Sequence, residues 1–421
     1  MPSSEIYYVR KINVGTRYSS GGINQIRKEP MNSKEVKSNL SPLGMTRRYF
    51  ARITAMLTAG AALPFYGESQ LAYAQLSKVG PLPPDAVKIN ANENPLGPCP
   101  EAIEAITKVI ARGGRYEYEM TDEFAKTLAE LEQLDTEYIL PFPGSSDPLH
   151  RAVLAYTSKE KPFIMSDPGY EAGARAAQFI GAKVIKIPVT KTFAHDVKAM
   201  VETAKATKAG LIYICNPNNP TGTITPRSEI EWVLANKPED TLLLLDEAYI
   251  HLSNEPLCSD LVAMDKDLII LRTFSKLYGM AGLRAGAAMG RPDLLKKLQN
   301  YGAGALPLTG MVGATASLKV KNLVPERRKI IKDVREDVFS FLEKNNFAFV
   351  PSVSNCFMLD VKRPAKQFVK AMQKEKIYVG RAWPVWPMHA RISIGTREEM
   401  AKFKTALVKV MNESPLQAKT E

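Results

Sequence analysis

The stretch Asp267–Arg284, DLIILRTFSKLYGMAGLR, joins an apolar run to a loop rich in hydrogen-bond donors. The near-continuous apolar run predicts a buried strand. The loop places Thr273, Ser275, Lys276 and Arg284 just after its carboxyl end. Four donors, two of them cationic, favour a negatively charged ligand at this point.

Two other apolar runs end in polar residues in the same way. GLIYIC, 210–215, leads into a loop that presents Asn219, and TLLLL, 241–245, leads into Asp246 and Tyr249. Apolar strands that alternate with helical segments predict an α/β fold: a mostly parallel sheet covered by helices on both faces. Because parallel strands end at one edge of such a sheet, we expect these loops to form one site.

The pattern changes beyond Pro307, where long helical stretches around 310–344 lead to short strands and a final helix near 397–412. This change predicts a second, smaller α+β domain. We expect four segments: a leader at 1–74, disordered or cleaved; a segment at 75–110 that joins the small domain; a large ligand-binding domain at 111–307; and the small domain at 308–421.

The first 74 residues have the features of an export signal. A basic start with Arg47-Arg48 is followed by a short apolar run and by Ala72-Tyr73-Ala74, typical of a cleavage site. The paired arginines indicate the twin-arginine variant, so we expect an exported, periplasmic protein, or a cytoplasmic one if the leader is not functional. Met1, Met31 and Met45 are alternative starts.

The distribution of charge argues against a nucleic-acid-binding protein, and the spacing of cysteines and histidines argues against a metal site. The net charge is +12, but residues 1–74 hold ten Lys/Arg and four Asp/Glu, so half of it lies in the leader. The remainder shows no basic block with interleaved aromatics, so nucleic-acid binding is not predicted. The four cysteines and four histidines lack metal-ligand spacing, and we predict no metal. The disulfide state of the cysteines stays open.

Taken together, these motifs resemble fold-type I pyridoxal-phosphate enzymes, and most closely the histidinol-phosphate aminotransferase group of the class I/II aminotransferases. The resemblance extends from NANENPLG, 90–97, to RISIGT, 391–396. It implies that pyridoxal 5'-phosphate is the cofactor. It also implies that Lys276 binds the cofactor aldehyde covalently and then moves the substrate Cα proton. Asp246 would pair with the pyridine nitrogen, while Asn219 and Tyr249 would contact the phenolic oxygen.

The resemblance also indicates which anion the stretch Asp267–Arg284 would bind. Thr273, Ser275 and Arg284 would surround the cofactor phosphate, joined by Ser145 and Ser146 at a helix start where Asp147 is the expected N-cap. A proline, Pro148, follows where relatives usually have an acidic residue.

Further roles implied by the resemblance concern the ring face, the neighbouring subunit and the substrate. Tyr170 would stack on the ring, with a core aromatic as the alternative. Tyr116 would reach the phosphate of a neighbouring subunit, which implies a homodimer with shared active sites; here Glu117 replaces the usual proline. Arg391 would clamp a substrate carboxylate or phosphate, with Arg381 as a second clamp.

The predicted function is amino transfer between an amino acid, or an amino-alcohol phosphate such as histidinol phosphate, and a 2-oxo acid. The donor and acceptor stay open, because YVGRAWPVWPMHAR, 378–391, departs from the family pattern. Its Trp383 and Trp386 fit either a side-chain pocket or the core of the small domain. The alternatives are a decarboxylase or lyase of the same fold and a non-catalytic binding protein on this scaffold.

Overall fold

The computed structural model describes residues 65, 67–77, 79–302 and 306–412. A seven-stranded sheet has the spatial order β2-β8-β7-β6-β5-β3-β4. All its neighbouring strands are parallel except β8, which is antiparallel to β2 and β7, so the expected mostly parallel sheet is confirmed. The strands are β2 (Ile139–Phe142), β3 (Phe163–Asp167), β4 (Val184–Pro188), β5 (Leu211–Cys215), β6 (Leu242–Asp246), β7 (Leu268–Thr273) and β8 (Gly286–Gly290).

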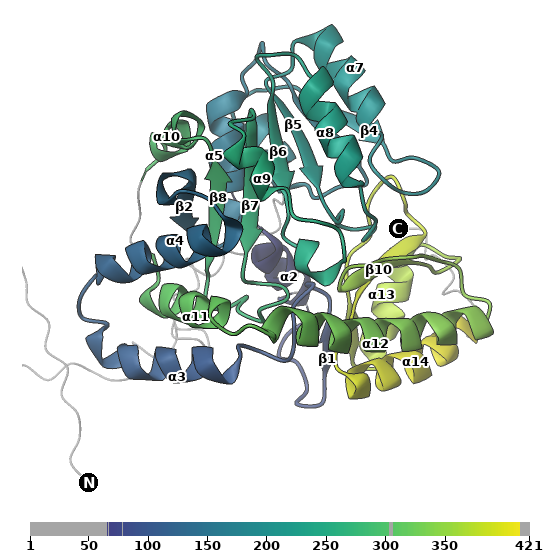
Figure 1. The fold of residues 1–421 in the computed structure, drawn as a ribbon. Coiled ribbons are helices and arrows are strands. Elements are labelled where there is room, and N and C mark those ends of the chain that lie inside the picture. Colours follow the sequence, from purple (N-terminus) through teal and green to yellow (C-terminus); the bar gives the residue numbers. More distant parts are fainter. Residues whose placement is uncertain (1–64, 66, 78, 303–305, 413–421) are drawn as a thin grey trace, which may run out of the picture. The chain divides into compact units, whose positions relative to one another are not determined.

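Helices cover both faces of this sheet, as predicted. The chain moves one way along the sheet through α5 and α6 and the other way through α7, α8 and α9, and right-handed crossovers put these two groups on opposite faces (Figure 1). The helices are α5 (Ser146–Tyr156), α6 (Ala172–Phe179), α7 (Val197–Thr207), α8 (Arg227–Asn236), α9 (Ser259–Ala263) and α10 (Pro292–Gln299).

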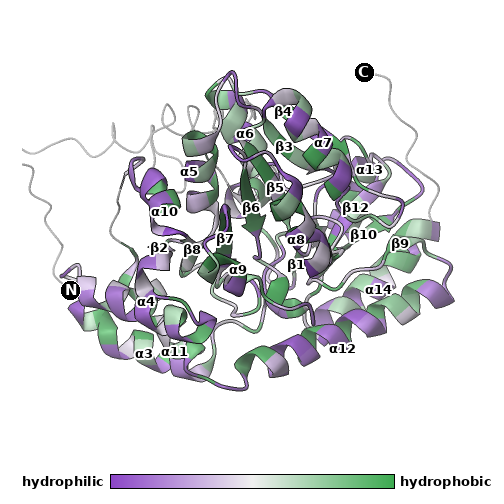
Figure 2. Ribbon diagram, turned by 45° about the horizontal axis from the view of Figure 1, so that its top comes forward, coloured by the Kyte–Doolittle hydropathy of each residue, from purple (hydrophilic) through white to green (hydrophobic). Residues whose placement is uncertain are grey.

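The central strands form the core. Every residue of β5, β6 and β7 is buried. Figure 2 shows β5 and β6 at the hydrophobic end of its colour scale, whereas the helices outside them carry alternating polar and apolar stripes. A strand covered on both faces has no solvent side, which is why these runs are nearly continuous in apolar residues.

Two smaller sheets lie beside each other in the C-terminal part. One has the order β12-β10-β9, and the other pairs β1 with β11 in parallel. The pairing brings residues 87–89 against 377–379. The elements are β1 (Val87–Ile89), β9 (Phe349–Val350), β10 (Cys356–Asp360), β11 (Ile377–Val379), β12 (His389–Ser393), α12 (Leu323–Lys344), α13 (Ala365–Lys374) and α14 (Arg397–Asn412).

Three helices pack together below the β2 edge of the large sheet (Figure 1). They are α3 (Pro100–Val109), α4 (Tyr118–Glu132) and α11 (Leu308–Leu318). Short 3-10 turns lie at Ile110–Arg112, Thr136–Tyr138 and Ile250–Leu252. Across the described part of the chain, no helix combines the length and the apolar character needed to span a bilayer.

The structure differs from the sequence prediction at the end of the leader. Residues 68–74 of the expected leader, together with residues 75–76, form helix α2 (Glu68–Leu76), which begins beside Ser146 and contacts β11 through Gln75. A Cβ on Gly67 would lie 2.6 Å from Ser146 Oγ, so only glycine permits this close approach. Sequence patterns did not indicate this helix's position, because its partners Ser146 and Val379 are distant along the chain. The rest of the expected leader, apart from Phe65, lies outside the described residues.

Candidate active site

A cavity opens at the carboxyl ends of β5, β6 and β7, where the sequence predicted a site. Its empty volume is about 650 Å³, a figure that includes open solvent at the mouth. It is lined by Glu68, Ser69, Ala91, Glu93, Ser145, Ser146, Tyr170, Cys215, Asn219, Asp246, Ala248, Tyr249, Thr273, Ser275, Lys276, Ala281 and Arg284.

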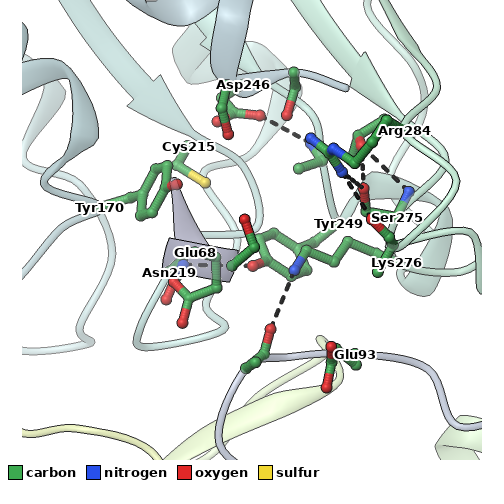
Figure 3. A pocket seen from close by; sticks show the side chains of 17 residues that line it. Glu68, Glu93, Tyr170, Cys215, Asn219, Asp246, Tyr249, Ser275, Lys276 and Arg284 are labelled. Atoms are coloured by element: carbon green, nitrogen blue, oxygen red, sulfur yellow. Dashed lines mark hydrogen bonds between the residues drawn. The ribbon is translucent and has the colours of Figure 1, made fainter. Parts of the chain in front are cut away.

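Asp246 is the last residue of β6 and is buried at the inner end of this cavity (Figure 3). Tyr213 Oη donates to its Oδ2 at 2.9 Å and the Ala248 amide donates to its Oδ1 at 3.2 Å. Burial raises the pKa of Asp246 to about 6, although both hydrogen bonds and Lys276 oppose the rise. The site therefore holds a carboxylate that a nearby cation would stabilise.

Lys276 lies in the loop after β7 and is also buried. Its Nζ donates to the carbonyl oxygens of Asn92 at 3.1 Å and Ala91 at 3.4 Å. Burial lowers the pKa of Lys276; Glu68 opposes this effect, and the guanidinium of Arg391 adds to it. A lowered pKa makes the neutral, nucleophilic amine more accessible.

The predicted anion cradle lies at one end of the cavity. Arg284 Nη1 donates to Ser275 Oγ at 3.1 Å, and Thr273 Oγ1 donates to the same oxygen at 3.0 Å. Arg284 Nη2 donates to the Pro143 carbonyl at 2.9 Å, and a Cβ on Gly144 would overlap this guanidinium. The cradle therefore depends on a glycine for its shape.

Helix α5 supplies the other wall of the cradle through Ser145 and Ser146. The expected N-cap at Asp147 is wrong: the helix begins at Ser146 with Ser145 as N-cap. Asp147 instead lies in the first turn, where it pairs with Arg151 at 2.8 Å. The helix N-terminus still faces the cavity, so its amides and dipole favour an anion there.

Tyrosine and asparagine side chains line the middle of the cavity. Tyr249 Oη accepts from Asn92 Nδ2 at 3.1 Å and from Asn219 Nδ2 at 3.4 Å. Burial raises the pKa of Tyr249 well above its ordinary value, so the hydroxyl stays protonated and can donate. Tyr170 is buried beside Ser146, on the wall formed by the start of α6.

Three predicted site residues do not line the cavity. Tyr116 is 69% exposed and its ring stacks on Tyr118, with centroids 5.7 Å apart. Arg391, in β12, is fully buried; its Nη1 donates to Asn219 Oδ1 at 3.1 Å. Arg381 donates to Glu171 Oε2 at 2.8 Å.

The ring of Trp383 packs against the guanidinium groups of both Arg381 and Arg391. Its ring centroid lies 4.5 Å from Cζ of Arg381 and 5.5 Å from Cζ of Arg391. Its Nε1 donates to the Gly169 carbonyl at 2.8 Å. Trp386 packs against Phe193 at 5.6 Å. Neither tryptophan lines the cavity, so of the two readings left open the structure favours small-domain core.

The sequence missed several site residues. Tyr213 lies within a strand and looked like core, and Asn92 belongs to a motif quoted only for family resemblance. Glu68 fell in the expected leader, yet it lines the cavity and ion-pairs with Arg381 and Arg391. The only usable sequence signal was the Asn90–Gly97 motif, which pointed to the segment holding Asn92.

The donor set fits pyridoxal phosphate. One cavity is lined by a lysine amine, by an anion cradle and by a buried carboxylate that has no cationic partner within hydrogen-bonding distance among the described residues (Figure 3). Among the described residues, no cluster of three His, Cys, Asp or Glu is arranged to hold a metal ion. Fold and site together define a pyridoxal-phosphate enzyme of fold type I.

Comparison with known proteins narrows the class. The family model for aminotransferase class I and II matches residues 84–407. Histidinol-phosphate aminotransferase 1 of Nitrosococcus oceani is 34% identical over 78% of this chain and 90% of its own. An aromatic amino acid aminotransferase of Cutibacterium acnes is 31% identical over 75% of this chain and 90% of its own.

A solved structure shares the fold. Histidinol-phosphate aminotransferase from Sinorhizobium meliloti, in complex with pyridoxal-5'-phosphate, superposes with a TM-score of 0.74 at 24% identity, covering 82% of this chain and 95% of that one. The chain therefore belongs to the class I and II aminotransferase family, which makes it a pyridoxal-phosphate-dependent transaminase.

Proposed function

We propose that the enzyme transfers the α-amino group of an L-amino acid to a 2-oxo acid, with Arg391 holding the substrate carboxylate. The observation that carries this assignment is the placement of Arg391. Its guanidinium is fully buried, and Asn219 links it to the cavity through a 3.1 Å hydrogen bond. A planar fork of donors fixes a carboxylate in one orientation, which in turn fixes the substrate Cα.

The residues expected around the cofactor have separate chemical roles. Lys276 would bind the cofactor covalently and, once released, take the proton from the substrate Cα and return it. Asp246 would hold a proton on the ring nitrogen, and the cradle of Ser145, Ser146, Thr273, Ser275 and Arg284 would bind the phosphate. The bound cofactor supplies the ring that stabilises negative charge at Cα and carries the amino group between two half-reactions.

This proton transfer requires the neutral amine of Lys276. Burial and the charge of Arg391 lower the pKa of Lys276 and so favour the neutral form. Tyr249 and Asn219 lie within hydrogen-bonding distance of each other and line the same wall, so both can contact the ring's phenolic oxygen. Tyr170 lies on the wall where stacking on the ring face is possible.

A single-turnover screen tests the assignment. The holoenzyme is mixed with each amino acid and, separately, with histidinol phosphate, and the cofactor absorbance is followed without an acceptor. We expect conversion to the amine form of the cofactor by at least one α-amino acid. Conversion by histidinol phosphate alone would show that Arg391 holds a phosphate instead, and carbon dioxide release without amino transfer would show a decarboxylase.

We also propose a homodimer in which Tyr116 contacts the partner's cofactor phosphate. Support comes from large apolar side chains gathered on α3, the following turn and α4: Ile103 is 52%, Ile110 63% and Tyr118 66% exposed. A second copy of the chain would cover them. Light scattering of the wild type and of Ile110→Asp tests this; a monomeric wild type with full cofactor affinity would contradict it.

Export through a twin-arginine signal is a further proposal, supported by the sequence around Arg47-Arg48 and by the motif Ala72-Tyr73-Ala74. Residues 1–64 lie outside the described part of the chain. Cell fractionation of the wild type and of a double Arg47→Lys, Arg48→Lys variant tests it. Periplasmic wild type and cytoplasmic variant are expected; equal distributions would refute the signal.

A further inference from the structure

Glu68 occupies the anion-binding side of the active site. Its Oε1 accepts from Arg381 Nη1 at 2.8 Å and from Arg391 Nη2 through a very short hydrogen bond. Burial opposes ionisation, but the two guanidinium groups hold the pKa of Glu68 at about 2. The chain thus places one of its own carboxylates where a substrate carboxylate is expected.

The carboxylate lies between the cavity and the two arginines. Glu68 lines the cavity, whereas Arg381 and Arg391 do not. Figure 3 shows Glu68 next to Asn219 and Tyr170 at this end of the cavity. Its second oxygen, Oε2, is buried and has no hydrogen-bond partner in the described part of the chain. A substrate entering from the cavity would therefore meet Glu68 before it meets Arg391.

Both Nη atoms of Arg391 are already engaged, whereas its buried Nε has no hydrogen-bond partner among the described residues. Nη1 donates to Asn219 Oδ1 at 3.1 Å, and Nη2 is shared between Glu68 and the Asn90 carbonyl at 2.7 Å. Bidentate recognition needs two parallel donors directed at one carboxylate. Nη2 becomes available only when Glu68 withdraws.

Apart from the ion pairs of Glu68 and a 3.5 Å hydrogen bond from Asn90 Nδ2 to Gln75 Oε1, helix α2 makes few contacts with the other described residues. Of its nine residues, only Ala72 is buried. Gln75 Nε2 donates to the Val379 carbonyl at 2.8 Å, and the Gly67 amide is capped by Gln70 within the same helix. Segments with little buried apolar surface and few tertiary hydrogen bonds open at low free-energy cost.

We propose that Glu68 is an internal occupant of the substrate-anion site, and that an incoming substrate carboxylate displaces it together with α2. The inference rests on the proposed role of Arg391. The substrate carboxylate then competes with Glu68 for the same arginines. Its apparent dissociation constant equals the intrinsic constant divided by the fraction of molecules in which the site is free. Cleavage after Ala74 would remove Glu68 from the chain and would leave the two arginines open.

Maleate tests the proposal, because it offers carboxylates but has no amino group to transfer. The full-length holoenzyme is titrated calorimetrically, and hydrogen exchange of residues 68–76 is measured with and without maleate. We expect maleate to increase exchange in α2. We expect Glu68→Gln to bind maleate at least about tenfold more tightly, as for a site that Glu68 fills in at least about nine molecules of ten.

Two variants separate occupancy from a mere electrostatic effect. Glu68→Asp keeps the charge but is one methylene shorter, so it should behave like Glu68→Gln if contact with both arginines matters. Glu104→Gln makes the same chemical change at an exposed site paired with Lys108, and should leave the affinity unchanged. Unchanged exchange in α2 on maleate binding, or wild-type affinity in Glu68→Asp, would overturn the proposal. Neither readout needs turnover, so both are independent of the amino-transfer screen.

Discussion

Replacing Asp246 by Asn should have opposite effects on the cofactor-free protein and on the working enzyme. Burial raises the pKa of Asp246 from its ordinary 3.8 to about 6, which corresponds to about 3 kcal/mol at 1.36 kcal/mol per pKa unit. The unfolded chain releases this proton first. The stability of the cofactor-free protein therefore falls as pH rises from about 4 to about 6, and the cost persists at higher pH.

Asparagine can keep both neighbours satisfied without the charge. Its Oδ1 can accept from the Ala248 amide and its Nδ2 can donate to Tyr213 Oη, since a hydroxyl both donates and accepts. Loss of charge-assisted character in these bonds costs about 1 kcal/mol. At pH 8 we expect the cofactor-free Asp246→Asn protein to be more stable than wild type by about 2 kcal/mol.

The holoenzyme should show the reverse. A neutral amide cannot hold a proton on the ring nitrogen, and the lost pair is worth about 4 kcal/mol at an effective dielectric constant of 20, or about a thousandfold in the half-reaction rate. Urea unfolding of the cofactor-free proteins at pH 4 and pH 8 and single-turnover kinetics measure the two effects. Asp85→Asn, at an exposed carboxylate, is the control. A variant that is less stable than wild type at pH 8 would refute the reasoning.

Three further changes test separate parts of the structure. Lys276→Ala should abolish covalent attachment of the cofactor, so borohydride reduction should add no cofactor mass to the chain by mass spectrometry, whereas the wild type gains it. Gly144→Ala should push the Arg284 guanidinium out of the cradle and weaken cofactor affinity by at least about tenfold in equilibrium dialysis, while Gly282→Ala, where a Cβ meets open space, should not. Arg272→Met should cost about 3–5 kcal/mol in urea unfolding, because Glu132 and Glu247 stay buried without their cation; equal midpoints would contradict this reading of the ion pairs.

Local sequence was sufficient to predict the sheet and several residues at its edge. Asp246 ends one apolar run, and Asn219 and Lys276 lie within four residues of the ends of two others; the carboxyl ends of parallel strands meet at one edge of the sheet. The antiparallel β8 and the exact start of α5 were not predicted. Helix boundaries depend on capping contacts, which is why the sequence prediction of Asp147 as the N-cap missed the start of α5 at Ser146.

Only the tertiary structure decided what surrounds these residues. The sequence determined a lysine, a carboxylate and an anion cradle because each follows from a short motif at a strand end. Glu68 and Arg391, by contrast, are 323 positions apart. Glu68 also lies in a segment whose sequence resembles a leader, so it was not considered a site residue. Ionic contacts depend on position in space and leave no periodic trace along the chain, so the carboxylate in front of Arg391 became visible only once the chain was folded.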